Sequence, residues 1–322
     1  QGLIRRVRFL ANPNGWFKKA IGALFVVVGL VIVTGNVIRV ETWLADHGYP
    51  NVSGLEQSLL GRASLPALDA SDRYREIANP SGFVNSEPIT IGQFIGKKVV
   101  LVDFMTYSCI NCIRTFPHLV AWDEEYGSQG LQIIGIHTPE FAFERKIENV
   151  TEAMGQYGIT FPIVLDNDYG TWNAYGNRYW PHEYLIDLDG KIVYDVVGEG
   201  HAEQTEAKIR ELLGLDEAPP SVPEPVVAEG PISPEVYFGS ARAVRSPNGP
   251  DLGGEWNVTR EAAVTAAPGA TVRYRFQANQ VYVVASAKSP TVIGVTVDGV
   301  ELDSVMVSDE RLYVLVDDKK TA

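Results

Sequence analysis

The two cysteines of the 322-residue chain, Cys109 and Cys112, are separated by only two residues. The pair follows an apolar run over residues 98–104 and precedes a helical pattern over residues 110–126. A thiol at such a junction faces the unpaired N–H groups and the positive dipole end of the helix, which favour the thiolate. One thiolate can then attack a substrate disulfide, and the second thiol can resolve the mixed disulfide. The spacing therefore predicts a redox-active pair centred on Cys109.

Other roles for the two cysteines are weaker. A structural disulfide across this short loop would remove little chain entropy from the unfolded state. A metal site would need two further ligands, and beyond His118 or His137 the chain offers no second cysteine pair to supply them. We therefore expect no metal and no cofactor other than the redox-active Cys109–Cys112 disulfide.

The elements that must position the cysteines alternate between strands and helices over residues 65–214. Apolar runs and a turn at Asp189-Gly190 predict strands, and helical periodicity predicts helices, the last one ended by Gly214. The predicted strands are 98–104, 131–137, 161–165, 183–187 and 191–196, and the predicted helices are 110–126, 141–157 and 202–213. This order predicts an α/β layer structure with helices on both faces of a sheet.

The N-terminal part of the chain predicts a membrane segment over residues 1–40. Residues 20–38 carry no charge and would reach about 28 Å as a helix, close to the hydrocarbon thickness of a bilayer. A signal peptide or a buried strand pair is the alternative, although a signal peptide is usually shorter. The basic residues before the run are Arg5, Arg6, Arg8, Lys18 and Lys19. The positive-inside rule therefore places everything after the span outside the cytoplasm, beginning with a spacer over residues 41–64.

The C-terminal part predicts a second domain. A linker over residues 215–234 carries six prolines, which favour an extended, semi-rigid chain. Short alternating runs then predict strands at 235–238, 271–277, 280–287, 291–297 and 311–316. Their spacing predicts a small antiparallel β-sandwich over residues 235–322, and we expect this domain to be cut short at its end. The start of the chain at Gln1 suggests a processed product or a fragment. The net charge of −13 gives little support to a nucleic-acid role.

Residues 65–214 resemble thioredoxin-fold proteins, most closely the extracytoplasmic TlpA-like branch. Asp103 lies where thioredoxins keep a buried carboxylate, and the resemblance implies that it accepts the proton of Cys112; the alternative is a strand aspartate bonded to backbone. Trp180-Pro181, just before a predicted strand, resembles the cis-proline loop of the family. A cis bond there implies that residue 180 lies beside Cys109 and offers an edge to a substrate segment.

The segment around the cysteines departs from the cytosolic thioredoxins at two places. Ile110-Asn111 replaces the usual Gly-Pro, and Tyr107-Ser108 stands where Trp is common. Both departures leave the redox potential and the direction of electron flow open. Together with Trp180, the resemblance makes Tyr107, Ser108, Ile110 and Asn111 the expected substrate contacts, beside the expected catalytic residues Cys109, Cys112, Asp103 and Pro181.

The whole layout resembles the C-terminal part of DipZ-type proteins. In that family a CcdA-like membrane domain precedes the thioredoxin-like domain and passes electrons outward, and the terminal domain is carbohydrate-binding-module-like. The resemblance implies a protein of the cell membrane with its C-terminal domains outside the cytoplasm. It further implies a thiol-disulfide oxidoreductase that reduces extracytoplasmic protein disulfides, in cytochrome c maturation or envelope thiol homeostasis.

Two other functions remain open at this point. A cell-envelope glycan-binding protein would use the thioredoxin unit as a scaffold and aromatic side chains of residues 235–322 for sugar stacking, although such side chains more often form a core. A thiol peroxidase would need Cys109 to react quickly with peroxide. The short cysteine spacing and the absence of a Pro/Thr-flanked cysteine argue against a peroxidase.

Overall fold

The computed structural model describes residues 73–216, 222, 233, 235–241, 249–265 and 267–317. The predicted span 20–38 and the predicted spacer 41–64 lie outside the described residues, and so does most of the predicted linker 215–234. Within the described ranges, no helix combines the length and the apolar character that crossing a bilayer would require.

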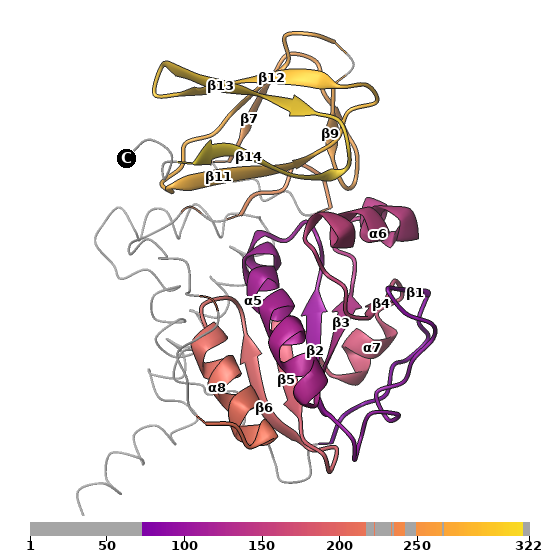
Figure 1. The fold of residues 1–322 in the computed structure, drawn as a ribbon. Coiled ribbons are helices and arrows are strands. Elements are labelled where there is room, and N and C mark those ends of the chain that lie inside the picture. Colours follow the sequence, from indigo (N-terminus) through magenta and orange to yellow (C-terminus); the bar gives the residue numbers. More distant parts are fainter. Residues whose placement is uncertain are drawn as a thin grey trace, which may run out of the picture. The chain divides into compact units, whose positions relative to one another are not determined.

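A six-stranded sheet forms the centre of the first domain, in the order β1-β4-β3-β2-β5-β6 (Figure 1). Strands β2, β3 and β4 run parallel, while β1, β5 and β6 are antiparallel to their neighbours. The strands are β1 Gly82–Val84, β2 Val99–Met105, β3 Leu131–His137, β4 Ile163–Leu165, β5 His182–Ile186 and β6 Ile192–Val197. Parallel strands joined by helices and an antiparallel hairpin are the predicted thioredoxin-like fold.

Helices pack on both faces of this sheet, as the alternating pattern predicts. The apolar residues of α5, α6 and α8 share one core cluster, while α7 and the segment before β2 contribute to the cluster on the other face. The helices are α5 Ile110–Tyr126, α6 Ile147–Gln156, α7 Gly170–Ala174 and α8 Ala202–Leu213, with short 3-10 turns at Gly127–Gln129 and Ala142–Arg145. Neither α7 nor β1 is predicted from the sequence, because each is too short to show a period.

The central strand β2 explains how the sheet presents a carboxylate to the cysteines. All seven of its residues are buried, and their side chains alternate between the two faces. Leu101 and Met105 belong to the core cluster on the α5 face, whereas Val102 and Phe104 belong to the other cluster. Asp103 lies between Leu101 and Met105 in this alternation, so its side chain points to the face that carries α5.

The prediction of one helix over residues 141–157 is wrong. The segment contains a 3-10 turn and then α6, with Lys146 in an extended conformation between them (φ −80°, ψ 121°). The buried carboxylate of Glu144 accepts hydrogen bonds from the N–H groups of Glu140 and Phe141, at 2.6 Å and 2.8 Å. These local hydrogen bonds cap a separate turn ahead of α6, and a periodic pattern does not reveal such a turn.

The described C-terminal residues form four antiparallel strand pairs, β7 with β10, β8 with β9, β11 with β14 and β12 with β13. Asp298 and Gly299 turn β12 into β13 with positive φ angles of 50° and 83°. The strands are β7 Asp251–Gly253, β8 Asn257–Val258, β9 Ala263–Val264, β10 Thr271–Arg273, β11 Gln280–Ala285, β12 Thr291–Val297, β13 Val300–Val307 and β14 Arg311–Asp317. The predicted β character is confirmed, while the sandwich arrangement stays a prediction.

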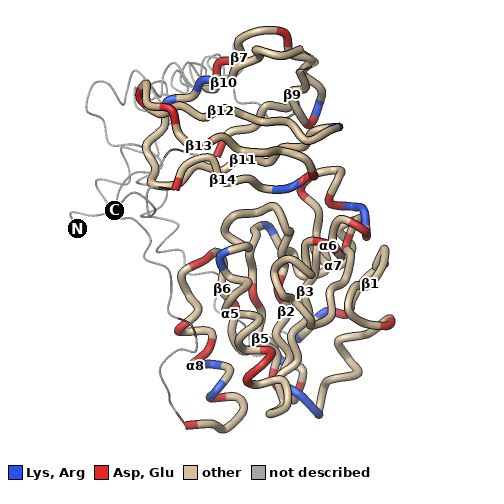
Figure 2. Tube along the Cα trace, turned by 45° about the horizontal axis from the view of Figure 1, so that its top comes forward, with Lys and Arg blue, Asp and Glu red and all other residues tan. Residues whose placement is uncertain are grey.

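The strand predicted at residues 235–238 is wrong, because these residues are not part of any described strand pair. The Tyr237 hydroxyl instead donates hydrogen bonds to Glu140 and Glu235, each at 2.8 Å. Basic and acidic residues are scattered among one another along the described trace (Figure 2). The described part of the chain therefore shows no continuous basic stripe of the kind that nucleic-acid binding would require.

Candidate active site around Cys109 and Cys112

Cys109 is the residue at which helix α5 begins. Its backbone is extended (φ −80°, ψ 118°), and its carbonyl accepts the first hydrogen bond of the helix from the Ile113 N–H at 2.9 Å. Cys112 lies one turn later and is fully buried, whereas Cys109 is partly exposed. Both are free thiols in this structure. The reachable sulfur is therefore that of Cys109, and the inner sulfur is that of Cys112.

The helix start separates the pKa values of the two thiols. The pKa of Cys109 is lowered, because the Cys112 thiol donates a hydrogen bond to its thiolate and the N–H groups of Cys112 and Asn111 also point to it. Burial raises the pKa of Cys112 well above its ordinary value, and the hydrogen bond that its protonated thiol donates to Cys109 raises it further. The exposed thiol therefore ionises first, as a nucleophile should, while the buried thiol holds its proton and needs a base before it can react.

Asp103 lies close enough to both cysteines to act on them electrostatically. Its side chain is fully buried, and neither carboxylate oxygen has a hydrogen-bond partner among the described residues. Burial, the Glu183 carboxylate and the Cys109 thiolate raise the pKa of Asp103 well above its ordinary value. The alternative of a strand aspartate bonded to backbone is therefore not what the structure contains, and this carboxyl can take up a proton.

Glu183 is a second buried carboxylate on the same face of the sheet. It pairs with Asp103 across β2 and β5, and its neighbour Leu185 belongs to the core cluster under α5. Its Oε2 accepts a hydrogen bond from the Thr205 hydroxyl at 3.0 Å. Burial is the larger effect and raises the pKa of Glu183 from 4.5 to about 7. The sequence analysis missed this residue, although a charged side chain within a buried strand was the available signal.

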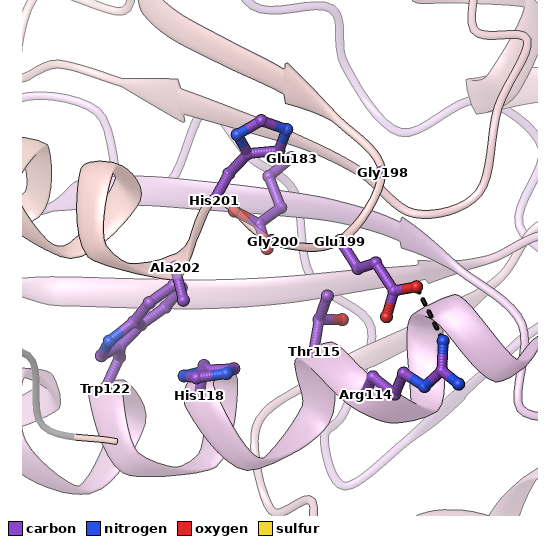
Figure 3. Close-up of a pocket in the computed structure, with 10 residues that line it drawn as sticks. All are labelled: Arg114, Thr115, His118, Trp122, Glu183, Gly198, Glu199, Gly200, His201 and Ala202. Carbon is purple, nitrogen blue, oxygen red and sulfur yellow. Dashed lines mark hydrogen bonds and ion pairs between the residues drawn. The ribbon is translucent and has the colours of Figure 1, made fainter. Parts of the chain in front are cut away.

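A small cavity of about 20 Å³ borders Glu183 (Figure 3). Thr115 and His118 of α5 line one side, and the loop that precedes α8 lines another. Arg114 donates a hydrogen bond to Glu199 at 2.8 Å at this cavity, while the buried second oxygen of Glu199 has no partner among the described residues. This volume and these polar walls suit a single water molecule.

Replacing Glu183 by glutamine should make protein stability less dependent on pH. A carboxyl whose pKa is raised by folding favours the folded state below its unfolded pKa, and this advantage is lost as the pH rises through its folded pKa. Since the pKa rises from 4.5 to about 7, the wild-type chain should lose about 3 kcal/mol of stability between about pH 5 and about pH 8 through this group alone. Urea unfolding of the wild type and of Glu183→Gln at the two pH values measures the free energy of unfolding of each. If the difference in this free energy between the two proteins were the same at both pH values, the burial argument would be contradicted.

The Trp180–Pro181 peptide is cis, as the sequence analysis predicts. Pro181 is buried directly before β5, and its carbonyl accepts a hydrogen bond from the Gly198 N–H at 2.9 Å. The Trp180 indole N–H donates to the Thr138 carbonyl at 3.1 Å, and its ring packs on Trp172 with centroids 4.3 Å apart. Trp180 and Cys109 both pack against the core cluster under α5 while remaining partly exposed. Hydrogen bonds to Thr138 and Gly198 therefore fix the loop, while the partly exposed Trp180 leaves it accessible to a partner.

The expected substrate contacts divide into two groups. Ile110, Asn111 and Trp180 are partly exposed, which leaves them open to a partner. Tyr107 and Ser108 are buried with only 2% and 3% of their surface accessible, so the prediction that they contact substrate is wrong for this conformation. The Tyr107 ring stacks on His137, and the Ser108 hydroxyl donates to the Glu144 carboxylate.

Glu144 supports the segment that precedes the cysteines. One carboxylate oxygen accepts hydrogen bonds from the hydroxyl groups of Thr106 and Ser108, each at 2.5 Å, and the other accepts the N–H groups of Glu140 and Phe141. The side chain is fully buried. The sequence analysis missed it, because residues 36 and 38 positions apart are joined here only through the fold.

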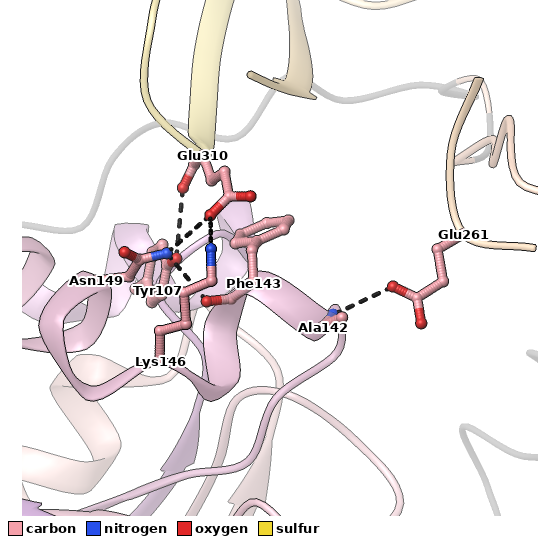
Figure 4. A network of polar contacts seen from close by, with 7 residues as sticks. All are labelled: Tyr107, Ala142, Phe143, Lys146, Asn149, Glu261 and Glu310. Carbon is pink, nitrogen blue, oxygen red and sulfur yellow. Dashed lines mark hydrogen bonds and ion pairs between the residues drawn. The ribbon is translucent and has the colours of Figure 1, made fainter. Parts of the chain in front are cut away.

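A residue of the C-terminal domain meets the same segment (Figure 4). The Glu310 carboxylate accepts hydrogen bonds from Lys146 at 2.8 Å and from Asn149 at 3.0 Å, and its carbonyl accepts one from the Tyr107 hydroxyl at 3.3 Å. Glu261 accepts a further bond from the Ala142 N–H. These contacts are made two residues before Cys109 and on the turn that contains Glu144.

Comparison with known proteins agrees with this geometry. Residues 70–213 match the redoxin family model, and residues 243–322 match the model described as thioredoxin like C-terminal domain. The chain is 35% identical over 280 residues to protein DipZ of Mycobacterium bovis, a match that covers 79% of this chain and 40% of that protein. The chain thus spans about two fifths of the length of DipZ. The predicted resemblance to DipZ-type proteins is confirmed.

Shorter relatives match less than half of the chain. The chain is 34% identical over 132 residues to the thiol-disulfide oxidoreductase ResA of Halalkalibacterium halodurans, a match that covers 40% of this chain and 70% of ResA. A crystal structure of a thiol-disulfide isomerase from Corynebacterium glutamicum is 20% identical, with a TM-score of 0.41, and covers 46% of this chain and 100% of that one. The redoxin match spans both cysteines, Asp103 and Pro181.

Proposed function

Because this chain belongs to the thioredoxin-like thiol-disulfide oxidoreductases over residues 70–213, we propose that it reduces disulfide bonds of other proteins through Cys109 and Cys112. One observation carries the proposal. A partly exposed thiol with a lowered pKa begins helix α5, and a buried thiol that retains its proton lies one turn behind it.

The reaction proceeds in two exchange steps. The Cys109 thiolate attacks one sulfur of the substrate disulfide, a mixed disulfide forms, and the other substrate sulfur leaves as a thiolate that takes a proton from solvent. Cys112 then transfers its proton to Asp103 and attacks the Cys109 sulfur, which expels the second substrate thiolate. The substrate gains two electrons, and the cysteine pair is oxidised to a disulfide. The cysteine pair is the only redox group that these steps use.

The partly exposed surface beside Cys109 supports substrate positioning. Ile110, Asn111 and Trp180 flank the reactive sulfur, and the backbone at the cis peptide offers an edge for an extended substrate segment. A loop held between Thr138 and Gly198 can order such a segment without itself rearranging. We therefore assign substrate contact to these three residues and leave Tyr107 and Ser108 in a supporting role.

The direction and the location of the reaction follow from the resemblance to DipZ. In this proposal the apolar run 20–38 anchors the chain in the cell membrane, and its C-terminal domains lie outside the cytoplasm. A CcdA-like membrane domain supplies electrons to the oxidised cysteine pair, and the substrates are disulfide-containing proteins of cytochrome c maturation or envelope thiol homeostasis. Glycan binding by residues 235–322 stays a prediction, and two aromatic side chains there, Tyr237 and Tyr282, contact the first domain.

The reduction potential of the full chain tests the direction. Equilibration with glutathione buffers, followed by quantification of the Cys109–Cys112 disulfide, gives the potential. A reductant should give a value near that of thioredoxin, at about −270 mV. A value near that of a strong oxidase, about −120 mV, would reverse the proposed direction.

Cys112→Ser should trap substrates on Cys109. The first exchange still occurs, because Cys109 is unchanged, but the resolving thiol is missing and the mixed disulfide persists. We expect disulfide-linked complexes that disappear on reduction and that are absent from the Cys109→Ser/Cys112→Ser double variant. Capture by the double variant, or no capture by the single one, would contradict the assigned order of attack.

A further inference from the structure

The two buried carboxylates are neighbours on the face of the sheet that carries Cys112. Asp103 on β2 and Glu183 on β5 are cross-strand partners that point to the α5 face, and Cys112 lies over the same core cluster. Glu183 also borders the cavity described above, whose wall includes the exposed residues Gly200 and His201. A proton that reaches Asp103 from Cys112 is otherwise enclosed, because Asp103 has no exposed surface and no hydrogen-bond partner among the described residues.

We propose that Glu183 carries protons between Asp103 and solvent, so that the base that deprotonates Cys112 is reset through the cavity beside residues 198–201. This inference rests on the proposed function, and it assigns Glu183 a role that acts through Asp103. When Cys112 gives its proton to Asp103, the proton passes through a bridging water molecule to the neighbouring Glu183 carboxylate and then to water in the cavity. No electron moves in this step, and Asp103 returns to its ionised form.

Two close carboxylates suit this task for an electrostatic reason. Like charges disfavour simultaneous ionisation, so the pair tends to share one proton, and either member can hold it. The groups that face Glu183 include a hydroxyl from α8 at Thr205 and titratable or charged side chains from every other element packed on it. These are Asp103 from β2, Tyr194 from β6, Arg114 and His118 from α5, and Glu199 and His201 from the loop before α8. The raised pKa of Glu183, about 7, lets it both accept and release a proton at neutral pH.

A chromogenic aromatic disulfide allows attack by Cys109 and resolution by Cys112 to be measured separately in the full chain. When one equivalent of dithiobisnitrobenzoate reacts with the reduced protein, Cys109 releases the first coloured thionitrobenzoate. Cys112 then attacks the Cys109 sulfur and releases the second. Stopped-flow absorbance therefore reports nucleophilic attack and resolution as two phases, and only the second phase requires Cys112 to lose its proton.

Glu183→Gln should slow the second phase about tenfold near neutral pH, at the low end of what proton transfer contributes, and should leave the first phase within about twofold. Its second phase should also show an inflection at lower pH, because Asp103 loses a negatively charged neighbour. Glu206→Gln is the matched control. Glu206 is buried on α8 and accepts a hydrogen bond from Tyr126 at 2.7 Å, but it does not line the cavity, so both phases should match the wild type.

Asp103→Asn distinguishes the relay from the underlying function. It should slow the second phase by about 100-fold, and adding Glu183→Gln should slow it no further, since the relay acts through Asp103. If Asp103→Asn is slow but Glu183→Gln has the rate and pH profile of the wild type, the relay is wrong and the proposed function stands. If Asp103→Asn leaves the second phase intact, the relay and the base role of Asp103 are wrong, while disulfide exchange by the cysteine pair stands. If the wild type releases no thionitrobenzoate, both the relay and the proposed function are wrong. Equal slowing by Glu206→Gln would also overturn the relay.

Discussion

Cys109→Ser should abolish disulfide reduction, with a rate loss of about 1,000-fold or more. The pKa of Cys109 is lowered by the Cys112 thiol and by N–H groups at the start of α5, so the wild-type residue reacts as a thiolate. A serine side chain is close to the same size, but its hydroxyl stays protonated at the start of α5. A protonated hydroxyl is a weak nucleophile unless a base activates it. Reduction of a protein disulfide by the full chain, with a thiol regenerating system, measures the loss.

Cys112→Ser is the paired control for this variant. It keeps the nucleophile, so it should release one substrate thiol per chain and then stop, whereas Cys109→Ser should release none. Circular dichroism should show that both variants retain the wild-type secondary structure, since neither substitution removes the backbone hydrogen bonds that begin helix α5. Turnover by Cys109→Ser above one tenth of the wild-type rate would place the reactive group elsewhere.

Glu144→Ala should give the largest loss of stability, about 4 kcal/mol. The Glu144 carboxylate is the acceptor for the hydroxyl groups of Thr106 and Ser108 and for two backbone N–H groups. The hydroxyl groups of Thr106 and Ser108 would lose this acceptor in a place that water does not reach, since both residues are buried. Urea-induced unfolding followed by tryptophan fluorescence measures the loss of unfolding free energy.

Glu152→Ala provides the control for Glu144→Ala. Glu152 is an exposed residue of α6, and its carboxylate accepts a hydrogen bond from the Gln156 side chain one turn later at 3.2 Å. Its removal should change stability by about 0.5 kcal/mol or less. If Glu144→Ala were no more than about 1 kcal/mol less stable than Glu152→Ala, the carboxylate would not be the acceptor that holds the segment before Cys109. The segment would then depend on other contacts, such as the stacking of Tyr107 on His137.

The predictions that held were those with a local cause. Helix α5 has the predicted bounds 110–126, because an apolar stripe and a sharp start after the strand are both readable along the chain. Helix α8 likewise ends at Gly214, which takes the left-handed conformation that the pattern implies (φ 69°). The cysteine spacing alone placed one thiol at the helix start and the other one turn inside it.

The errors share a different cause. Tyr107 and Ser108 stand beside Cys109 in the sequence and were therefore expected at the surface, but the contacts that bury them come from His137 and Glu144. The helix expected over residues 141–157 breaks for the same reason, because the Glu144 side chain turns inward to accept hydrogen bonds from Thr106 and Ser108. An interaction between residues tens of positions apart leaves no periodic trace in either segment.

The sequence by itself thus determined which thiols can carry out disulfide exchange. The start of the helix, the spacing of the cysteines and the position of Asp103 all lie within a few consecutive residues. Only the tertiary structure decided what surrounds them. The register of β2 against β5 sets Glu183 opposite Asp103, and the loop before α8 closes the cavity beside it. Strand pairing and packing bring together residues about 80 positions apart, and the free energies that fix them belong to the assembled core and not to any one segment.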